Sequence, residues 1–179
     1  VLDDDGIFTL LFTHNKTEAW DTLTTALTEA GFTVNATHPV STESPLSLHQ
    51  AGKNSAESTI LLASEKQKQT GDSPEYTLWD DIKRETQRVA EQKARELDQQ
   101  EVEFTKVDMI LASFGTTLKV FTKNYPVVDD EGNKIQPQQA LDEARNAVSE
   151  YLIETYLNDG VRDVDSKTEW YVLSWLVFE

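Results

Sequence analysis

The feature that most constrains this chain is a strand, a helix and a second strand within its first 37 residues. Residues 7–13 form an apolar run rich in β-forming residues, which is typical of a strand buried on both faces of a parallel sheet. The next segment has apolar residues at helical spacing, a cap formed by Asn15 and Glu18, and a stop at Gly31. Residues 32–37 alternate apolar and polar side chains, so we expect a second strand joined to the first by a right-handed crossover.

Polar segments divide the rest of the chain. Residues 58–64 are a short apolar run and predict a third strand. The polar segment before it, residues 41–57, is too long to be a simple turn. A second polar stretch at residues 65–74 ends this part of the chain. We therefore expect two regions, residues 1–72 and residues 73–179.

The second region has the pattern of a helical bundle. Helical spacing of apolar residues predicts helices at 78–100, 107–125, 137–158 and 166–178. Pro126 ends the second of these helices, and the acidic residues 127–134 predict a turn or a small hairpin. The last helix is apolar nearly all round, which implies burial. Since both ends of the chain carry elements that need burial, we expect it to be a piece of a longer polypeptide.

Acidic residues outnumber basic residues two to one. The 179 residues include 32 Asp or Glu and 16 Lys or Arg, which gives a formal net charge of −16, against roughly 2 to 8 in magnitude for a small domain. This excess fits an acidic partner-binding surface or adaptation to concentrated salt. Because the acids are spread over every segment, we favour a halophilic source, where the Debye length is about 3 Å at molar salt. At ordinary ionic strength, the lack of a basic stripe argues against binding a phosphate backbone, and at high salt this objection weakens.

Composition also limits the available chemistry. The chain contains no cysteine, which excludes disulfides, cysteine-based zinc sites and thiol nucleophiles. Its three histidines are too far apart in sequence for a local metal motif, and we expect no metal ligand. No apolar run reaches the roughly 20 residues of a membrane helix, so we expect a soluble, cytoplasmic protein with no membrane partner.

Two sets of residues carry a resemblance to a known family. In the first region they are residues 12–16, 19–20, 23, 26–27, 30–32, 39–40, 42–43 and 58–64. In the second region they are residues 114–115, 118–121, 125–127, 140–141 and 168–173. These segments are similar to the C-terminal part of large prokaryotic, here haloarchaeal, adenine-specific DNA methylases that contain a zinc ribbon.

The resemblance implies a fold of the α/β class. It would consist of a partial Rossmann-type methyltransferase sheet, with the last three strands and one crossover helix, followed by an α-helical region. In such sheets the final two strands form an antiparallel pair at the edge.

The implied activity is methyl transfer from S-adenosylmethionine to the exocyclic amine of adenine in DNA, with the base flipped out of the stack. Members hold the cofactor with a Gly-rich turn and the amine with an Asp- or Asn-Pro-Pro-aromatic motif. Neither motif occurs here, and the zinc-ribbon cysteines are also missing. We therefore expect these parts upstream of Val1, as the partner of this segment, and expect no catalytic or cofactor-binding residue in the chain itself. The isolated chain would be inactive and would bind no cofactor, whereas the full-length protein would bind DNA.

Four residues are candidates to face the substrate. His14 and Lys16 follow the first strand, and ligands of open α/β sheets bind at the carboxyl ends of strands. His14 would face the base or its phosphate, or simply stabilise a turn, while Lys16 would contact phosphate or be an ordinary exposed lysine. Thr42 and Glu43 open the 41–57 loop and would belong to a substrate-side loop or to a simple turn.

A second function class fits the same sequence. The chain would then be a non-enzymatic α/β interaction module of a halophile that binds a protein partner. An incomplete sheet also exposes a strand edge, so self-association of copies through that edge is expected to be possible in either case.

Overall fold

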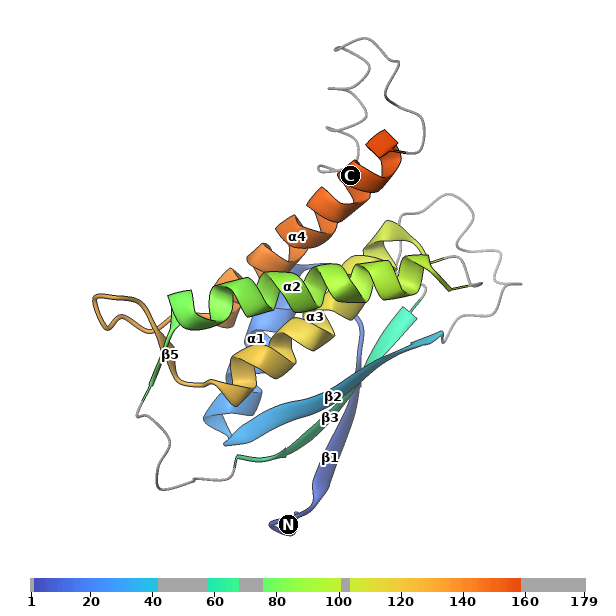
Figure 1. Ribbon diagram of the computed structural model, residues 1–179. Coiled ribbons are helices and arrows are strands. Elements are labelled where there is room, and N and C mark those ends of the chain that lie inside the picture. Colours follow the sequence, from blue (N-terminus) through green and yellow to red (C-terminus); the bar gives the residue numbers. More distant parts are fainter. Residues whose placement is uncertain (1, 42–57, 68–75, 101–103, 159–179) are drawn as a thin grey trace.

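The computed structural model describes residues 2–41, 58–67, 76–100 and 104–158 (Figure 1). These residues form five strands and four helices in a mixed α/β arrangement. In chain order the elements are β1 (Ile7–Phe12), α1 (Thr17–Glu29), β2 (Phe32–Ser41), β3 (Ser58–Lys66), β4 (Thr77–Leu78), α2 (Trp79–Asp98), α3 (Lys106–Lys123), β5 (Val127–Val128) and α4 (Pro137–Asn158). None of the helices in this part of the chain is both long and apolar enough to cross a bilayer.

The main sheet has the strand order β1–β3–β2. β3 runs antiparallel to both neighbours, so β1 and β2 run in the same direction and are joined by α1. This confirms three expected strands and a helix that joins two strands of equal direction. β2 also carries a β-bulge between Val34 and Ala36, which shifts its register against β3.

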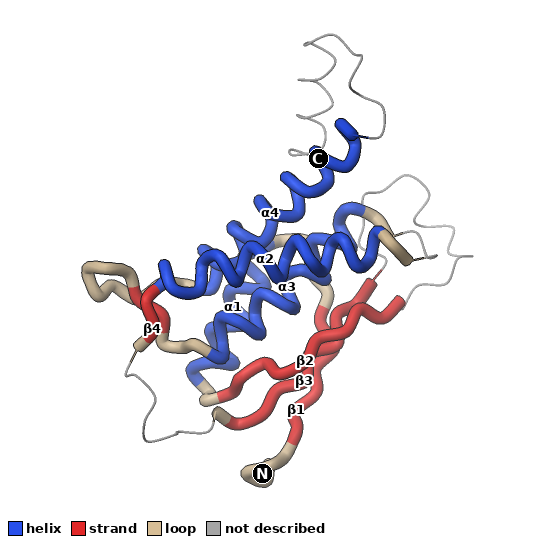
Figure 2. The backbone as a smooth tube through the Cα atoms, in the orientation of Figure 1, coloured by secondary structure: helices blue, strands red, loops and turns tan. Residues whose placement is uncertain are grey.

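The prediction that the first strand is buried on both faces of a parallel sheet is wrong. Among the described strands β1 pairs with β3 alone, and it pairs antiparallel. Leu10 and Phe12 pack against the core, whereas Ile7 and Leu11 on the other face are 61% and 56% exposed. The reason is that α1 and α3 both lie on the core side of the sheet (Figure 2). An apolar run alone does not tell a covered strand from an edge strand with one open face.

The helical layer packs directly onto this sheet. α3 covers β2, while α2 and α4 pack against α3 and against each other. One continuous hydrophobic core contains Trp20 and Ile60 from the first expected region and Phe114 and Leu141 from the second. The two regions therefore share a core, and their division at residue 72 stays a prediction.

Three of the predicted helices correspond to α2, α3 and α4, with ends that differ by at most two residues. The fourth, at 166–178, lies outside the described residues. The second region is not purely helical, because β4 and β5 pair in parallel as a small second sheet. The acidic segment after β5 closes as a hairpin through a bridge between Val128 and Lys134, as expected.

The predicted cap of the first helix is wrong. α1 begins after Lys16, and no side chain caps its first turn by a hydrogen bond. Asn15 and Glu18 do not form the expected pair, because the residue in the N-cap position is Lys16. The backbone N–H of Lys16 donates to Nδ1 of His14. A full capping box occurs elsewhere, between Thr105 and Asp108 at the start of α3.

Candidate functional site

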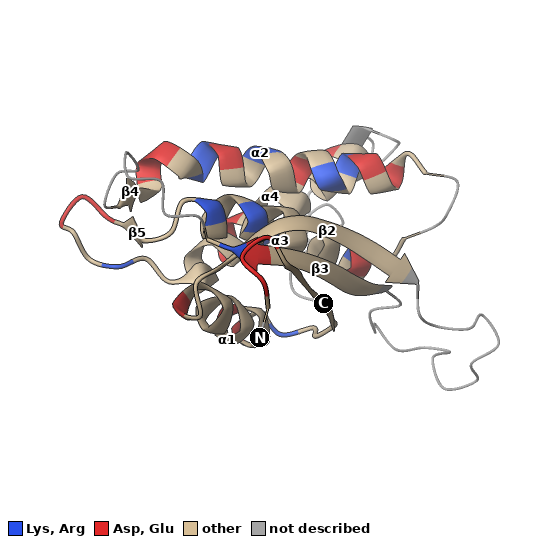
Figure 3. Ribbon diagram, turned by 90° about the horizontal axis from the view of Figure 1, so that it is seen from below, with Lys and Arg blue, Asp and Glu red and all other residues tan. Residues whose placement is uncertain are grey.

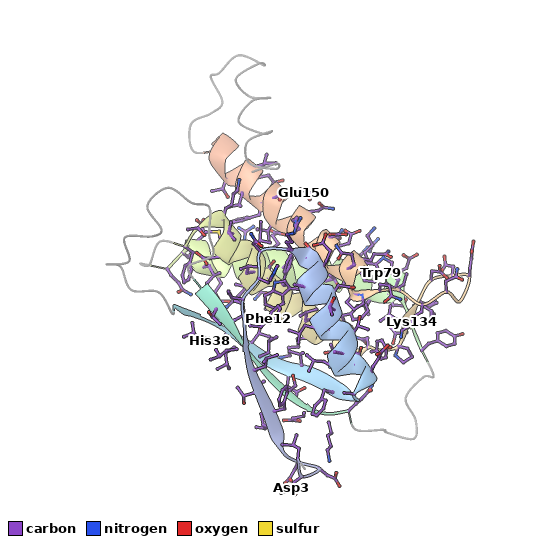
Figure 4. The ribbon with its side chains drawn as sticks, turned by 180° about the vertical axis from the view of Figure 1, so that it is seen from behind. Asp3, Phe12, His38, Trp79, Lys134 and Glu150 are labelled. Atoms are coloured by element: carbon purple, nitrogen blue, oxygen red, sulfur yellow. The ribbon has the colours of Figure 1, made fainter. Side chains whose placement is uncertain are left out.

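The carboxyl ends of the two parallel strands meet at one end of the main sheet. Phe12, the last residue of β1, and Pro39 in β2 are both opposite Ile60 of β3. Figure 4 shows Phe12 and the neighbouring His38 near this end. His14 follows two residues after Phe12, and β2 ends two residues after Pro39 at Ser41. The sheet thus places His14 at the same end as the start of the 42–57 segment. Thr42 and Glu43 themselves lie outside the described residues.

Two hydrogen bonds hold His14 in place. Its carbonyl oxygen accepts a hydrogen bond from Nε1 of Trp20 at 2.7 Å, and its Nδ1 accepts the backbone N–H of Lys16 at 3.0 Å. A neutral imidazole that accepts at Nδ1 carries its hydrogen on Nε2. The side chain is exposed. His14 therefore stabilises the turn, which is one of the two roles expected from the sequence. Its Nε2–H also faces solvent as a hydrogen-bond donor.

Trp20 anchors this turn to the core. Its ring is fully buried and makes edge-to-face contacts with Phe12 at 4.8 Å and with Phe114 at 5.9 Å between centroids. Such aromatic pairs contribute about 0.5–1.5 kcal/mol each beyond the area that they bury. The indole N–H, which would be costly to bury alone, bonds the His14 carbonyl. The position of His14 is therefore set by the aromatic core rather than by a mobile loop.

The sequence analysis missed one cation at this end of the sheet. Arg145 of α4 donates a hydrogen bond to the hydroxyl of Thr17, the first residue of α1, and its guanidinium lies 5.9 Å from the centroid of the Phe114 ring. Within the described residues Arg145 forms no ion pair with a carboxylate. A single arginine in an acidic helix gives no sequence signal, because its neighbour in space is 128 residues away.

His14, Lys16 and Arg145 form what we call the basic cluster, around the first turn of α1. Each presents hydrogen-bond donors, and the uncapped N-terminus of α1 adds a partial positive charge. Lys16 is exposed and immediately precedes Thr17. The basic cluster has no nucleophile paired with a general base, and its donors can hydrogen-bond an anion, although Glu18 places a carboxylate in the same first turn.

The described residues contain no group of three or more His, Asp or Glu side chains arranged to hold a metal ion. Comparison of the chain with models of protein families, with curated proteins and with solved structures gives no match.

Proposed function

We propose that this chain is the C-terminal segment of an S-adenosylmethionine-dependent DNA methyltransferase that acts on the exocyclic amine of adenine. On this proposal the cofactor site, the amine-binding motif and the zinc ribbon lie upstream of Val1. The enzyme would act in the cytoplasm, where prokaryotic DNA is accessible. The role of this segment would be to complete the sheet and to contact the DNA.

The observation that carries the proposal is the topology of the main sheet together with the position of His14. Two parallel strands joined by a helix, followed by an antiparallel strand, fit the end of a Rossmann-type methyltransferase sheet. His14 then lies at the carboxyl end of a parallel strand, where open α/β sheets bind ligands. Among the described strands β1 pairs with β3 alone, and an edge strand of this kind is also what an incomplete sheet would leave.

In this enzyme the basic cluster would contact a DNA phosphate near the flipped adenine. Hydrogen-bond donors around the first turn of α1, on a chain of charge −16, suit a phosphate better than a base edge. Such contacts position the DNA and carry no sequence information of their own.

The decisive experiment is methyl transfer by the protein encoded by the complete parent reading frame. With labelled S-adenosylmethionine and adenine-containing DNA, we expect N6-methyladenine from the full-length protein and none from the 179-residue chain. Calorimetry should show no cofactor binding by the chain alone, and micromolar binding would contradict the proposal. A reading frame that starts at Val1 would also overturn it and favour the protein-binding module.

The basic cluster is tested in the same full-length protein by DNA affinity as a function of salt. Lys16→Ala and Arg145→Ala should each weaken DNA binding, and each should reduce the slope of log affinity against log salt by about one. Arg84→Ala, at an exposed position of α2, is the matched control and should leave the slope unchanged. Unchanged slopes in both cluster variants would remove DNA contact from the proposal.

A further inference from the structure

A groove with an apolar floor runs between α2 and α3 on the side away from α4. Its volume is about 540 Å³, and Ile82, Val89 and Val120 line it. Its lining also includes Glu96, near the C-terminal end of α2, and Lys123, at the C-terminal end of α3. Figure 3 shows acidic and basic positions along α2 and basic positions on α3.

The charges of the groove are not matched across its width. Within the described part of the chain, Lys119 and Lys123 of α3 form no ion pair. The acidic residues Asp81 and Glu85 on the α2 wall also lack a partner on the opposite wall. An apolar floor with charged walls suits an apolar segment that carries its charges at its two ends.

We propose that residues 166–178 of this chain dock in the α2–α3 groove. These residues lie outside the described part of the structure, and their sequence is the reason for the assignment. Eight of the nine residues from Trp170 to Phe178 are apolar, so this segment needs an apolar surface to cover it. Tethering to α4 gives the segment a high effective concentration beside any surface it can reach.

The course of α4 brings the chain beside one end of α2. Tyr151 of α4 donates a hydrogen bond to Asp98 at the end of α2, at 2.7 Å, so α4 passes beside the Glu96 end of the groove. Between Asn158 and Ser166 lie seven residues, which span up to roughly 23 Å when extended. The exposed face of the main sheet lies on the far side of the sheet from α4 and is a poorer fit for this path.

Length and charge fit one direction of docking. A helix from Ser166 to Glu179 would be about 20 Å long, and the α2 wall from Glu96 to Asp81 is about 22 Å long at 1.5 Å per residue. When the segment enters at the Glu96 end, Lys167 lies near Glu96 and Glu179 lies near Lys123. Each charge at the ends of the segment then meets its opposite.

The absence of native cysteine makes disulfide mapping a direct test. In the full chain, Val120→Cys on the groove floor is combined with a cysteine at position 172, 173 or 176 in turn. At least one pair should close within the same molecule at least about tenfold faster than the matched pairs that carry Leu11→Cys on the outer face of the sheet. Non-reducing electrophoresis and mass spectrometry identify the products.

Lys123→Cys serves as a second probe, because a substitution at this exposed position leaves the core intact. Faster closure with Leu11→Cys would overturn the proposal in favour of the sheet face. Closure only between molecules would overturn it in favour of a second copy, and no preference at either groove position would also refute it. None of these outcomes depends on methyl transfer, so they are independent of the proposed function.

Discussion

The carboxylate of Asp21 in α1 accepts the backbone N–H of Gln138 at 2.7 Å and thereby caps the first turn of the neighbouring helix α4. The two residues are 117 positions apart, so the cap exists only in the folded chain. Asp21→Ala should lower the free energy of unfolding by about 1 kcal/mol, as the loss of an N-cap does. Asp21→Asn keeps an acceptor and should lose less in urea titrations. An alanine variant as stable as the wild type would show that the cap contributes nothing.

A second long-range bond supports the β-bulge. The buried backbone N–H of Val34 donates to Oγ1 of Thr122 in α3 at 2.9 Å. Thr122→Val keeps the shape of the side chain but leaves this N–H without its acceptor, so we expect a loss of about 1–3 kcal/mol in urea unfolding. Thr122→Ser retains the hydroxyl and should lose less. A valine variant as stable as the wild type would contradict this role for the threonine.

The close approach of α3 to β2 depends on Gly115. A Cβ atom there would lie 2.8 Å from both Cβ and Oγ1 of Thr37, and the Cβ atom of Thr37 cannot move away without moving the strand. Gly115→Ala gains about 1 kcal/mol of helix propensity but should lose about 1–3 kcal/mol through overpacking. We expect a net loss of stability in thermal unfolding, while Thr116→Ala on the same helix controls for propensity. A more stable alanine variant would show that the strand gives way easily.

Burial raises the pKa of the Tyr151 phenol, and its hydrogen bond to Asp98 raises it further. Because the pKa of the folded state exceeds the unfolded value of about 10, the stability linked to this group is complete below about pH 10 and is lost as the pH rises through the folded pKa. In urea titrations between pH 8 and 11.5, the wild type should lose stability more steeply than Tyr151→Phe. Tyr76→Phe, at a 53% exposed tyrosine, is the control. Parallel profiles for wild type and Tyr151→Phe would refute this linkage.

The sequence predicts elements that depend on local patterns, but it does not predict how distant segments pack against each other. Helical spacing places α2, α3 and α4 to within two residues, because one amphipathic face and a stop at Pro126 are local signals. The open face of β1 is not local, since the same apolar run fits a covered strand and an edge strand. Arg145 joins the candidate site for a similar reason: its contact with Thr17 depends on how α4 packs on α1. His14 could be named as a candidate site residue from the sequence, because its place directly after a strand is a local signal.

Because the net charge is −16, the dependence of stability on salt concentration tests the surface electrostatics directly. The structure shows five ion pairs among the described residues, most of them exposed, and such pairs contribute about 0–1 kcal/mol each. Raising KCl from 0.1 to 1 M shortens the Debye length from about 10 to about 3 Å. Screening weakens these few pairs but relieves repulsion among a larger number of unpaired acids. We therefore expect the free energy of unfolding to rise with KCl.

A double variant tests the same repulsion by removing negative charges instead of adding salt. Asp130 and Glu131 are exposed neighbours in the hairpin after β5, so Asp130→Asn combined with Glu131→Gln lowers the local negative charge and leaves the bonds of Asp129 to the backbone in place. This double variant should be more stable than the wild type at 0.1 M KCl, and the difference should shrink at 1 M because the repulsion is already screened there. A difference that persists at high salt would mean that the effect comes from the turn conformation and not from charge. Stability that falls with KCl in the wild type would show that the ion pairs outweigh the repulsion.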